Sequence, residues 1–226
     1  MWPAPPIRED VVSVIINAHH LHCGWLQYDE KKGLYLSAFD SYAHEHATHL
    51  SIHKHLEQFI NTYQLTNSFL TIALSSPLIY QDFVRLSKAS PLLADFQMKQ
   101  LHPLLWDYQY LHALDDGNHL FYLKGIKKSA FFEYHLLAHI CQLKLITLTS
   151  TYAAQLAAYA QLHGKAFRQS KLSLDLAKHT YNIAACFDRD ALARMLHITA
   201  QARTAINFQE VLTAMIGSYY TESRSS

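Results

Sequence analysis

Two stretches of the sequence, residues 12–29 and 171–188, have the layout of a β-hairpin and constrain the fold most strongly. In the second stretch, Leu172, Leu174 and Leu176 alternate with small or polar residues, and another alternating run follows Lys178 and His179. A period of two is typical of a half-buried strand. The two stretches begin 159 residues apart and predict a duplicated α/β unit. Because few positions agree in identity, a chance match is the alternative.

Composition indicates a folded protein without a nucleic-acid partner. The 226 residues are 50% hydrophobic and 16% charged, which excludes a disordered chain and suffices for one large domain or two small ones. The formal net charge is +1, with 19 basic and 18 acidic residues. Such a balance creates no field that would attract DNA, RNA or an anionic membrane.

The cysteines and the amino terminus indicate a cytoplasmic protein. Cys23, Cys141 and Cys186 are far apart and form no CxxC spacing, so we expect buried, reduced thiols rather than a redox or metal site. The proline-rich residues 1–10 lack the apolar core of a signal peptide, and no apolar run reaches the roughly 18 residues of a membrane helix.

Periodicity and turn chemistry predict a βββαβ order in the first part of the chain. Three short runs form an antiparallel meander, an amphipathic helix follows, and a continuous apolar run is typical of a buried strand. We also expect Pro77 to open a helical turn. The predicted segments are strands 11–17, 22–28 and 34–39, helix 48–63, strand 69–74 and helical turn 78–82.

The rest of the chain predicts a βαβα run between two helical segments. Asp115, Asp116 and Gly117 signal a turn before its first strand, and Ser150 or Thr151 is expected to cap its last helix. Residues 190–198 fit a helix or a strand equally. The expected segments are a mainly helical 90–106, strands 108–111 and 119–125, helix 127–142, strand 143–148, helix 150–162, and helix 207–219 capped by Asn207.

This order resembles the two-lobed actin-like fold, a ribonuclease H-like βββαβα unit that occurs twice. More narrowly, the chain resembles the PilM, HofM and ComA group of type IV pilus and competence proteins. The resembling segments are SFLTIALSSPLIYQDFVRL at 68–86, LFYLKGIKKSAFFEYHLLAHICQLKLITLTSTYAAQLAAYA at 120–160 and SLDLAKHTYNIAACF at 173–187. The implied organisation is a lead at 1–10, a first lobe at 11–90, a bridging or inserted segment at 91–170, and a second lobe at 171–226.

The resemblance implies a non-catalytic assembly component of a type IV pilus or DNA-uptake machine. Such a protein is cytoplasmic and lies at the inner membrane because it binds the cytoplasmic tail of a PilN-like bitopic partner; a pilus motor ATPase is a possible second partner. We expect the tail to bind between the meander and the 48–63 helix or the 69–74 strand. Exposed aromatic residues are an alternative peptide-binding surface: Trp106, Tyr108, Tyr110, Phe121 and Tyr122.

The resemblance also implies ATP with Mg²⁺ between the lobes, with Asp175 and Lys178 as nucleotide contacts. Phosphate loops require small residues, since backbone N–H groups must approach the phosphate closely. The first loop here reads IINAHHLHCGW at 15–25, and Ala177 occupies a glycine position. We therefore expect no enzyme activity. A nucleotide-binding ATPase or kinase relative that uses Asp175 is the alternative.

A histidine-rich segment suggests a second alternative, a metal-binding protein. His49 and His53 are four residues apart and would share one helix face, with Glu45 or His46 completing a site. With 16 histidines in the chain, ordinary surface histidines explain this segment equally well. Around the first hairpin turn, a strand places His20 and His22 on one face and Cys23 on the other, which is typical of structural residues; His19 precedes them in the same turn.

Overall fold

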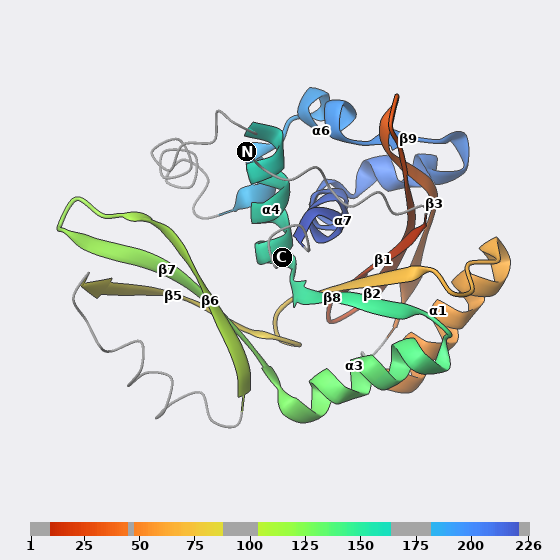
Figure 1. Ribbon diagram of the computed structural model, residues 1–226, viewed down its shortest axis with the longest axis horizontal. Helices are drawn as coiled ribbons and strands as arrows, with labels where there is room; N and C mark the ends of the chain where they lie inside the picture. Colours follow the sequence, from red (N-terminus) through yellow and green to blue (C-terminus); the bar gives the residue numbers. More distant parts are fainter. Residues whose placement is uncertain (1–9, 45–47, 88–103, 164–181, 222–226) are drawn as a thin grey trace.

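The structure is a computed structural model that describes residues 10–44, 48–87, 104–163 and 182–221 (Figure 1). These residues form a six-stranded sheet with helices on both faces and a separate three-stranded sheet. The α/β class predicted from the sequence is confirmed. Among the described helices, none is both long enough and apolar enough to cross a membrane.

The six-stranded sheet has the order β8-β4-β1-β2-β3-β9. The predicted meander is present, with β1, β2 and β3 antiparallel, while β4 runs parallel to β1 and β8 runs parallel to β4. The order and directions of β3, β2, β1, β4 and β8 are those of the predicted ribonuclease H-like unit. The strands are β1 (Val11–Ile16), β2 (His20–Asp29), β3 (Gly33–Ala43), β4 (Phe69–Leu74), β8 (Lys144–Ser150) and β9 (His197–Ile198).

Helices cover both faces of this sheet (Figure 1). Helices α1 (His49–Tyr63) and α3 (Lys128–Ile140) cover one face, and α4 (Thr151–His163) and α7 (Gln209–Thr221) cover the other. Strand β1 divides its side chains between two cores, because alternate residues point to opposite faces. Val12, Val14 and Ile16 pack on the α1 and α3 side, whereas Val11 and Ile15 pack on the α4 and α7 side.

The predicted helix starts in this unit are confirmed. The Thr48 side chain accepts a hydrogen bond from Ser51 N at 3.2 Å, and the Ser150 hydroxyl accepts one from Ala153 N at 3.1 Å. These side chains satisfy N–H groups that the first helical turn leaves without partners. Local chemistry therefore fixes where α1 and α4 begin.

A buried hydroxyl cluster fixes α7 against the sheet. The Ser218 hydroxyl lies 2.9 Å from the Ser13 hydroxyl and 3.0 Å from the Thr71 hydroxyl, and it donates to the Met215 carbonyl. All three hydroxyl side chains are buried. Because buried hydroxyls are costly without partners, this cluster favours one register of α7 over β1 and β4.

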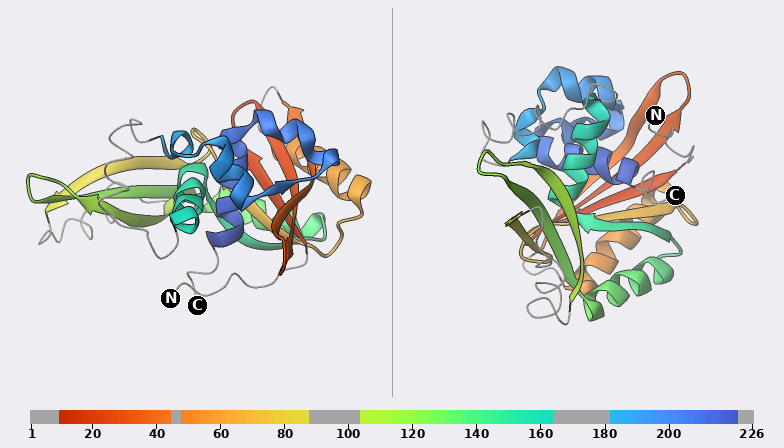
Figure 2. Two further views of the ribbon diagram at one scale, coloured as in Figure 1. Left: turned by 90° about the horizontal axis from the view of Figure 1, so that it is seen from above. Right: turned by 60° about the vertical axis from the view of Figure 1, so that its left-hand side comes forward.

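The second sheet is inserted between β4 and α3 and extends away from the six-stranded sheet (Figure 2). It consists of β5 (Tyr80–Ser87), β6 (Leu104–Ala113) and β7 (Asn118–Lys127), in the order β5-β7-β6. The predicted turn at 115–118 joins β6 to β7, and the strand at 119–125 is confirmed. The predicted helical turn at 78–82 is wrong, since Tyr80 begins β5 and pairs with Gly125.

The helix predicted for 90–106 is also wrong at its end. Residues 104–106 belong to β6, and residues 88–103 lie outside the described residues. Strand β6 pairs along its length with β7, and this pairing stabilises residues 104–106 as a strand.

The carboxyl-terminal part departs from the predicted second hairpin. The described part of that prediction is wrong, because η2 (Ile183–Cys186) is a 3-10 helix; residues 171–181 lie outside the described residues. Asn182 accepts from Ala185 N, and Asp188 accepts from Ala191 N at the start of α6 (Arg189–Met195). These side chains favour helical starts over strand continuation. Within the described residues the βββαβ unit therefore occurs once.

The remaining elements return the chain to the six-stranded sheet. The segment 190–198, which the sequence left open, contains both α6 and the two-residue strand β9, which pairs with β3. The predicted cap Asn207 is wrong, because Asn207 ends the 3-10 helix η3 (Ala200–Asn207) and α7 begins at Gln209.

Candidate partner-binding groove

A groove of about 190 Å³ lies where the small sheet meets the six-stranded sheet. Its walls come from β6, β7, β8 and the first turns of α3. The lining is mainly apolar, with one lysine and one aspartate among the side chains. The lining residues are Ile79, Leu105, Trp106, Asp107, Lys124, Gly125, Ile126, Phe131, Leu148 and Thr149.

Lys124 connects the two sheets across this groove. Its ammonium group lies 3.3 Å from Asp107 Oδ2 in the small sheet and donates to Thr149 Oγ1 in β8, also at 3.3 Å. Lys124 is partly buried, whereas Asp107 is well exposed, so the pair contributes little stability by itself. It does place one cation and one anion on the wall of an otherwise apolar groove.

A second contact fixes the angle between the sheets. The Tyr122 hydroxyl lies 2.6 Å from the Ser150 hydroxyl at the end of β8 and donates to Gln81 Oε1 at 3.0 Å. Burial raises the pKa of Tyr122 to about 12, so this hydroxyl stays protonated at neutral pH. The Tyr122 ring also lies 4.5 Å from the Tyr152 ring. The groove is therefore held open by buried contacts.

Strand β8 offers its backbone beside the groove. It is the outermost strand of the six-stranded sheet, and in the described part of the chain its neighbour is β4 alone. Unpaired N–H and C=O groups on such an edge can pair with an extended peptide, while alternate side chains enter adjacent pockets. The arrangement is suited to holding a short segment of another protein.

The groove does not lie where the sequence predicted it. Between the meander and α1, the space is filled by core side chains that include Val12, Val14, Ile52 and Phe59. Because interiors are packed closely, no peptide can enter there. No local pattern in the sequence points to Lys124 or Thr149, since their roles depend on contacts between strands far apart in the chain.

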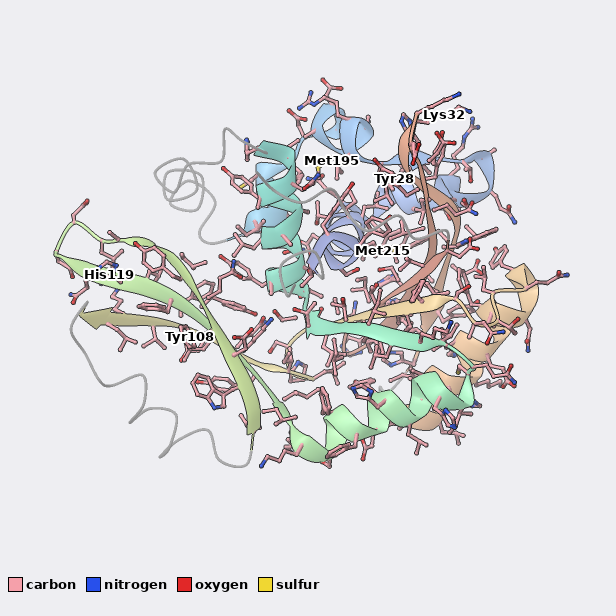
Figure 3. The ribbon with its side chains drawn as sticks, in the orientation of Figure 1. Tyr28, Lys32, Tyr108, His119, Met195 and Met215 are labelled. Carbon is pink, nitrogen blue, oxygen red and sulfur yellow. The ribbon has the colours of Figure 1, made fainter. Side chains whose placement is uncertain are left out.

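The predicted aromatic surface is divided between the two faces of the small sheet. On one face, the Tyr108 ring lies between the rings of Trp106 and Phe121, with its centroid 6.1 Å from each of theirs. Tyr108 and His119 are labelled on this sheet in Figure 3. Tyr122 points to the other face, where it contacts Tyr152. Only Trp106 of the five predicted aromatic residues lines the groove.

The predicted nucleotide contacts Asp175 and Lys178 lie outside the described residues. The turn at the first phosphate-loop position, residues 17–20, lies within the described residues, and its polar groups form hydrogen bonds with each other. Asn17 Oδ1 accepts from His19 N at 2.9 Å and from His20 N at 2.7 Å. A phosphate at this turn would have to displace the Asn17 side chain.

The predicted metal ligands His49 and His53 lie on one side of α1 and line a hollow beside α3. His49 Nε2 forms an ion pair with Glu133, and Glu45 and His46 lie outside the described residues. In the described part of the chain, no three His, Cys, Asp or Glu side chains are placed to hold a metal ion. The metal site stays a prediction.

The other histidine cluster is structural, as predicted. His20 and His22 share one face with ring centroids 5.7 Å apart, while Cys23 is buried in the opposite core. His22 also lies against Phe39 and Phe208. Burial, followed by the charges of His20 and His44, lowers the pKa of His22 to about 4. Burial raises the pKa of the Cys23 thiol, so it is not a reactive thiolate.

Comparison with known proteins supports the fold assignment. No family model and no curated protein matches the sequence. A solved PilM-PilN type IV pilus biogenesis complex matches with a TM-score of 0.51 and 15% identity, over 69% of this chain and 52% of that chain. This chain thus spans about half the length of that protein.

Two other solved structures align less well. The cytoplasmic domain of EpsL, an inner-membrane component of the type II secretion system of Vibrio cholerae, matches with a TM-score of 0.44 and 9% identity, over 65% of this chain and 59% of that one. A Bacteroides thetaiotaomicron protein with an actin-like ATPase fold matches with a TM-score of 0.38 and 13% identity, over 73% of this chain and 60% of that chain. The strand order and the match to the PilM-PilN structure show that this chain has an α/β, actin-like fold.

Proposed function

We propose that this protein is an assembly component that binds a short, extended segment of a partner protein in the groove between its two sheets. The observation that carries the proposal is the position of the groove beside the open edge of β8. A segment bound there would pair its backbone with β8 and insert side chains between Leu105, Ile126 and Leu148.

The partner that we propose is the cytoplasmic tail of a PilN-like inner-membrane protein in a type IV pilus or a related secretion machine. The support is the shared fold with the PilM-PilN biogenesis complex. In this proposal the protein works in the cytoplasm and is held at the inner membrane through that tail. A motor ATPase is a further candidate partner of the same assembly.

A charge in the groove wall is expected to abolish tail binding. We expect Leu105→Asp to weaken binding of a fluorescein-labelled PilN-like tail peptide at least about 30-fold, because the carboxylate would be desolvated against an apolar ligand. Fluorescence anisotropy measures the affinity. Ile206→Asp is the matched control, since Ile206 is also exposed and lies in η3, outside the groove.

Two results would count against the groove. Absence of binding to the unmodified protein would reject the tail as its ligand. Equal affinity for the protein and for Leu105→Asp would place the binding site elsewhere.

We further propose that the protein binds its partner without chemistry and without nucleotide. The support is the turn in which Asn17 occupies the N–H groups of His19 and His20. Isothermal titration with Mg²⁺ and ATP is expected to give no saturable heat at micromolar protein. Micromolar binding that is lost in Asp175→Asn would instead support the ATPase or kinase alternative.

A further inference from the structure

Large apolar side chains gather on the outer surface of α1 and α3. Leu50 is 79% exposed, Phe132 67%, Leu136 57% and Ile140 54%. They are the four most exposed large hydrophobic residues in the described part of the chain. Exposed apolar surface that is concentrated in one place marks an interaction site.

Helix α3 is apolar on two sides, although only one side packs against the six-stranded sheet. Its inner side packs Tyr134, Leu137 and Ala138 into the core. Phe132, Leu136 and Ile140, which we call the α3 stripe, follow at intervals of four residues and therefore share the outer side. A helix that covers one face of a sheet needs only the first set.

A hollow of about 250 Å³ lies beside the α3 stripe, between α3 and α1. Its walls are mostly apolar, and the His49–Glu133 ion pair lies among them. An apolar cavity of about 150 Å³ is enough to bind benzene. The hollow can therefore receive a phenyl ring. Its lining residues are His49, His53, Glu133, Leu136, Leu137 and Ile140.

The projecting Phe132 and the hollow are on the same surface but are distinct, because Phe132 does not line the hollow. A two-fold axis that lies in the plane of this surface, midway between them, exchanges the two features. One copy would then insert Phe132 into the hollow of the other copy and receive the other Phe132 in return. A surface with both features complements itself, as a two-fold interface requires.

We propose that the outer surface of α1 and α3 is a two-fold interface between two copies of this chain. The exposed apolar area of this surface is close to the apolar area that each partner contributes to a standard interface. At about 100 Å² for each of the four side chains, the surface presents about 400 Å². A standard interface covers about 800 Å² on each partner, of which slightly more than half is apolar, or roughly 450 Å².

Sedimentation velocity from about 1 to 100 µM tests the interface, since a standard interface gives affinities in this range or tighter. The full chain is expected to shift from 25.9 kDa toward twice this mass as concentration rises. Leu136→Glu is expected to weaken dimerisation at least about 100-fold, and Phe132→Ala at least about 10-fold. Ile206→Glu, a charge at an apolar site in η3 that is 50% exposed, should dimerise like the unmodified protein.

Circular dichroism verifies that each variant is folded, which is expected because the substituted side chains are exposed. A monomer at every concentration would overturn the proposal. A dimer that persists unchanged in both Leu136→Glu and Phe132→Ala would also overturn it, since another surface would then join the copies. The proposal does not depend on tail binding, because Leu105→Asp should leave the dimer intact.

Discussion

Gly217→Val is expected to remove a large part of the stability of the protein. Helix α7 crosses α4 at this glycine, and a Cβ added to Gly217 would overlap the carbonyl group of Ala154. The obstacle is helical backbone, which cannot move aside as a flexible side chain would. Relief of the overlap would separate two helices whose contact is buried, at a cost of about 4 kcal/mol or more. This is a large share of the 5 to 15 kcal/mol that stabilises a typical domain.

Urea denaturation followed by circular dichroism measures this effect. Gly117→Ala is the matched control, because a Cβ there meets no atom within 4 Å and the only cost is its positive φ of 80°. That control should lose about 1 kcal/mol. A Gly217→Val protein as stable as the control would show that α4 and α7 do not approach this closely.

Mild acid is expected to destabilise the protein through His22. This imidazole is buried beside His20, Phe39 and Phe208, and its pKa is lowered from 6.5 to about 4. In the unfolded chain His22 therefore binds a proton below pH 6.5, whereas in the folded protein it binds that proton only below about pH 4. The stabilisation is complete above pH 6.5 and is lost as the pH falls toward 4, with a total of about 3 kcal/mol.

His22→Phe isolates this contribution from that of the carboxylates. Free energies of unfolding at pH 7.5, 6, 5 and 4.5 are expected to fall less steeply in the variant than in the unmodified protein. His19→Gln, which removes an exposed histidine from the same turn, should keep the original slope. Identical slopes in the protein and in His22→Phe would show that His22 is not buried as a neutral imidazole.

Much of the six-stranded sheet and its helices was predictable because its signals are local. The three short runs in residues 11–39, separated by turn residues, and the cap Ser150 each act within a few residues of the chain. The resemblance of 68–86 and 120–160 to PilM-like proteins indicated an actin-like fold, and the comparison with solved structures agrees. The predicted pair His49 and His53 was correctly placed on one face of α1.

The second hairpin and the groove were not predictable in this way. An alternating pattern at 183–187 fits a strand, but Asn182 and Asp188 cap helical turns there instead. Residues 80–87 became a strand because they pair with β7, about forty residues later in the chain. Propensity cannot report such pairings, since a strand is stabilised by its neighbours.

By itself the sequence determined the meander, the principal helices, the cap Ser150 and the turn at 115–118, because each depends on residues adjacent in the chain. Only the tertiary structure decided that Lys124 would bridge to Thr149, that Gly217 would touch Ala154, and that Phe132 would project beside a hollow. The physical reason is that binding surfaces form where segments distant in sequence meet, and their shape follows from packing between those segments.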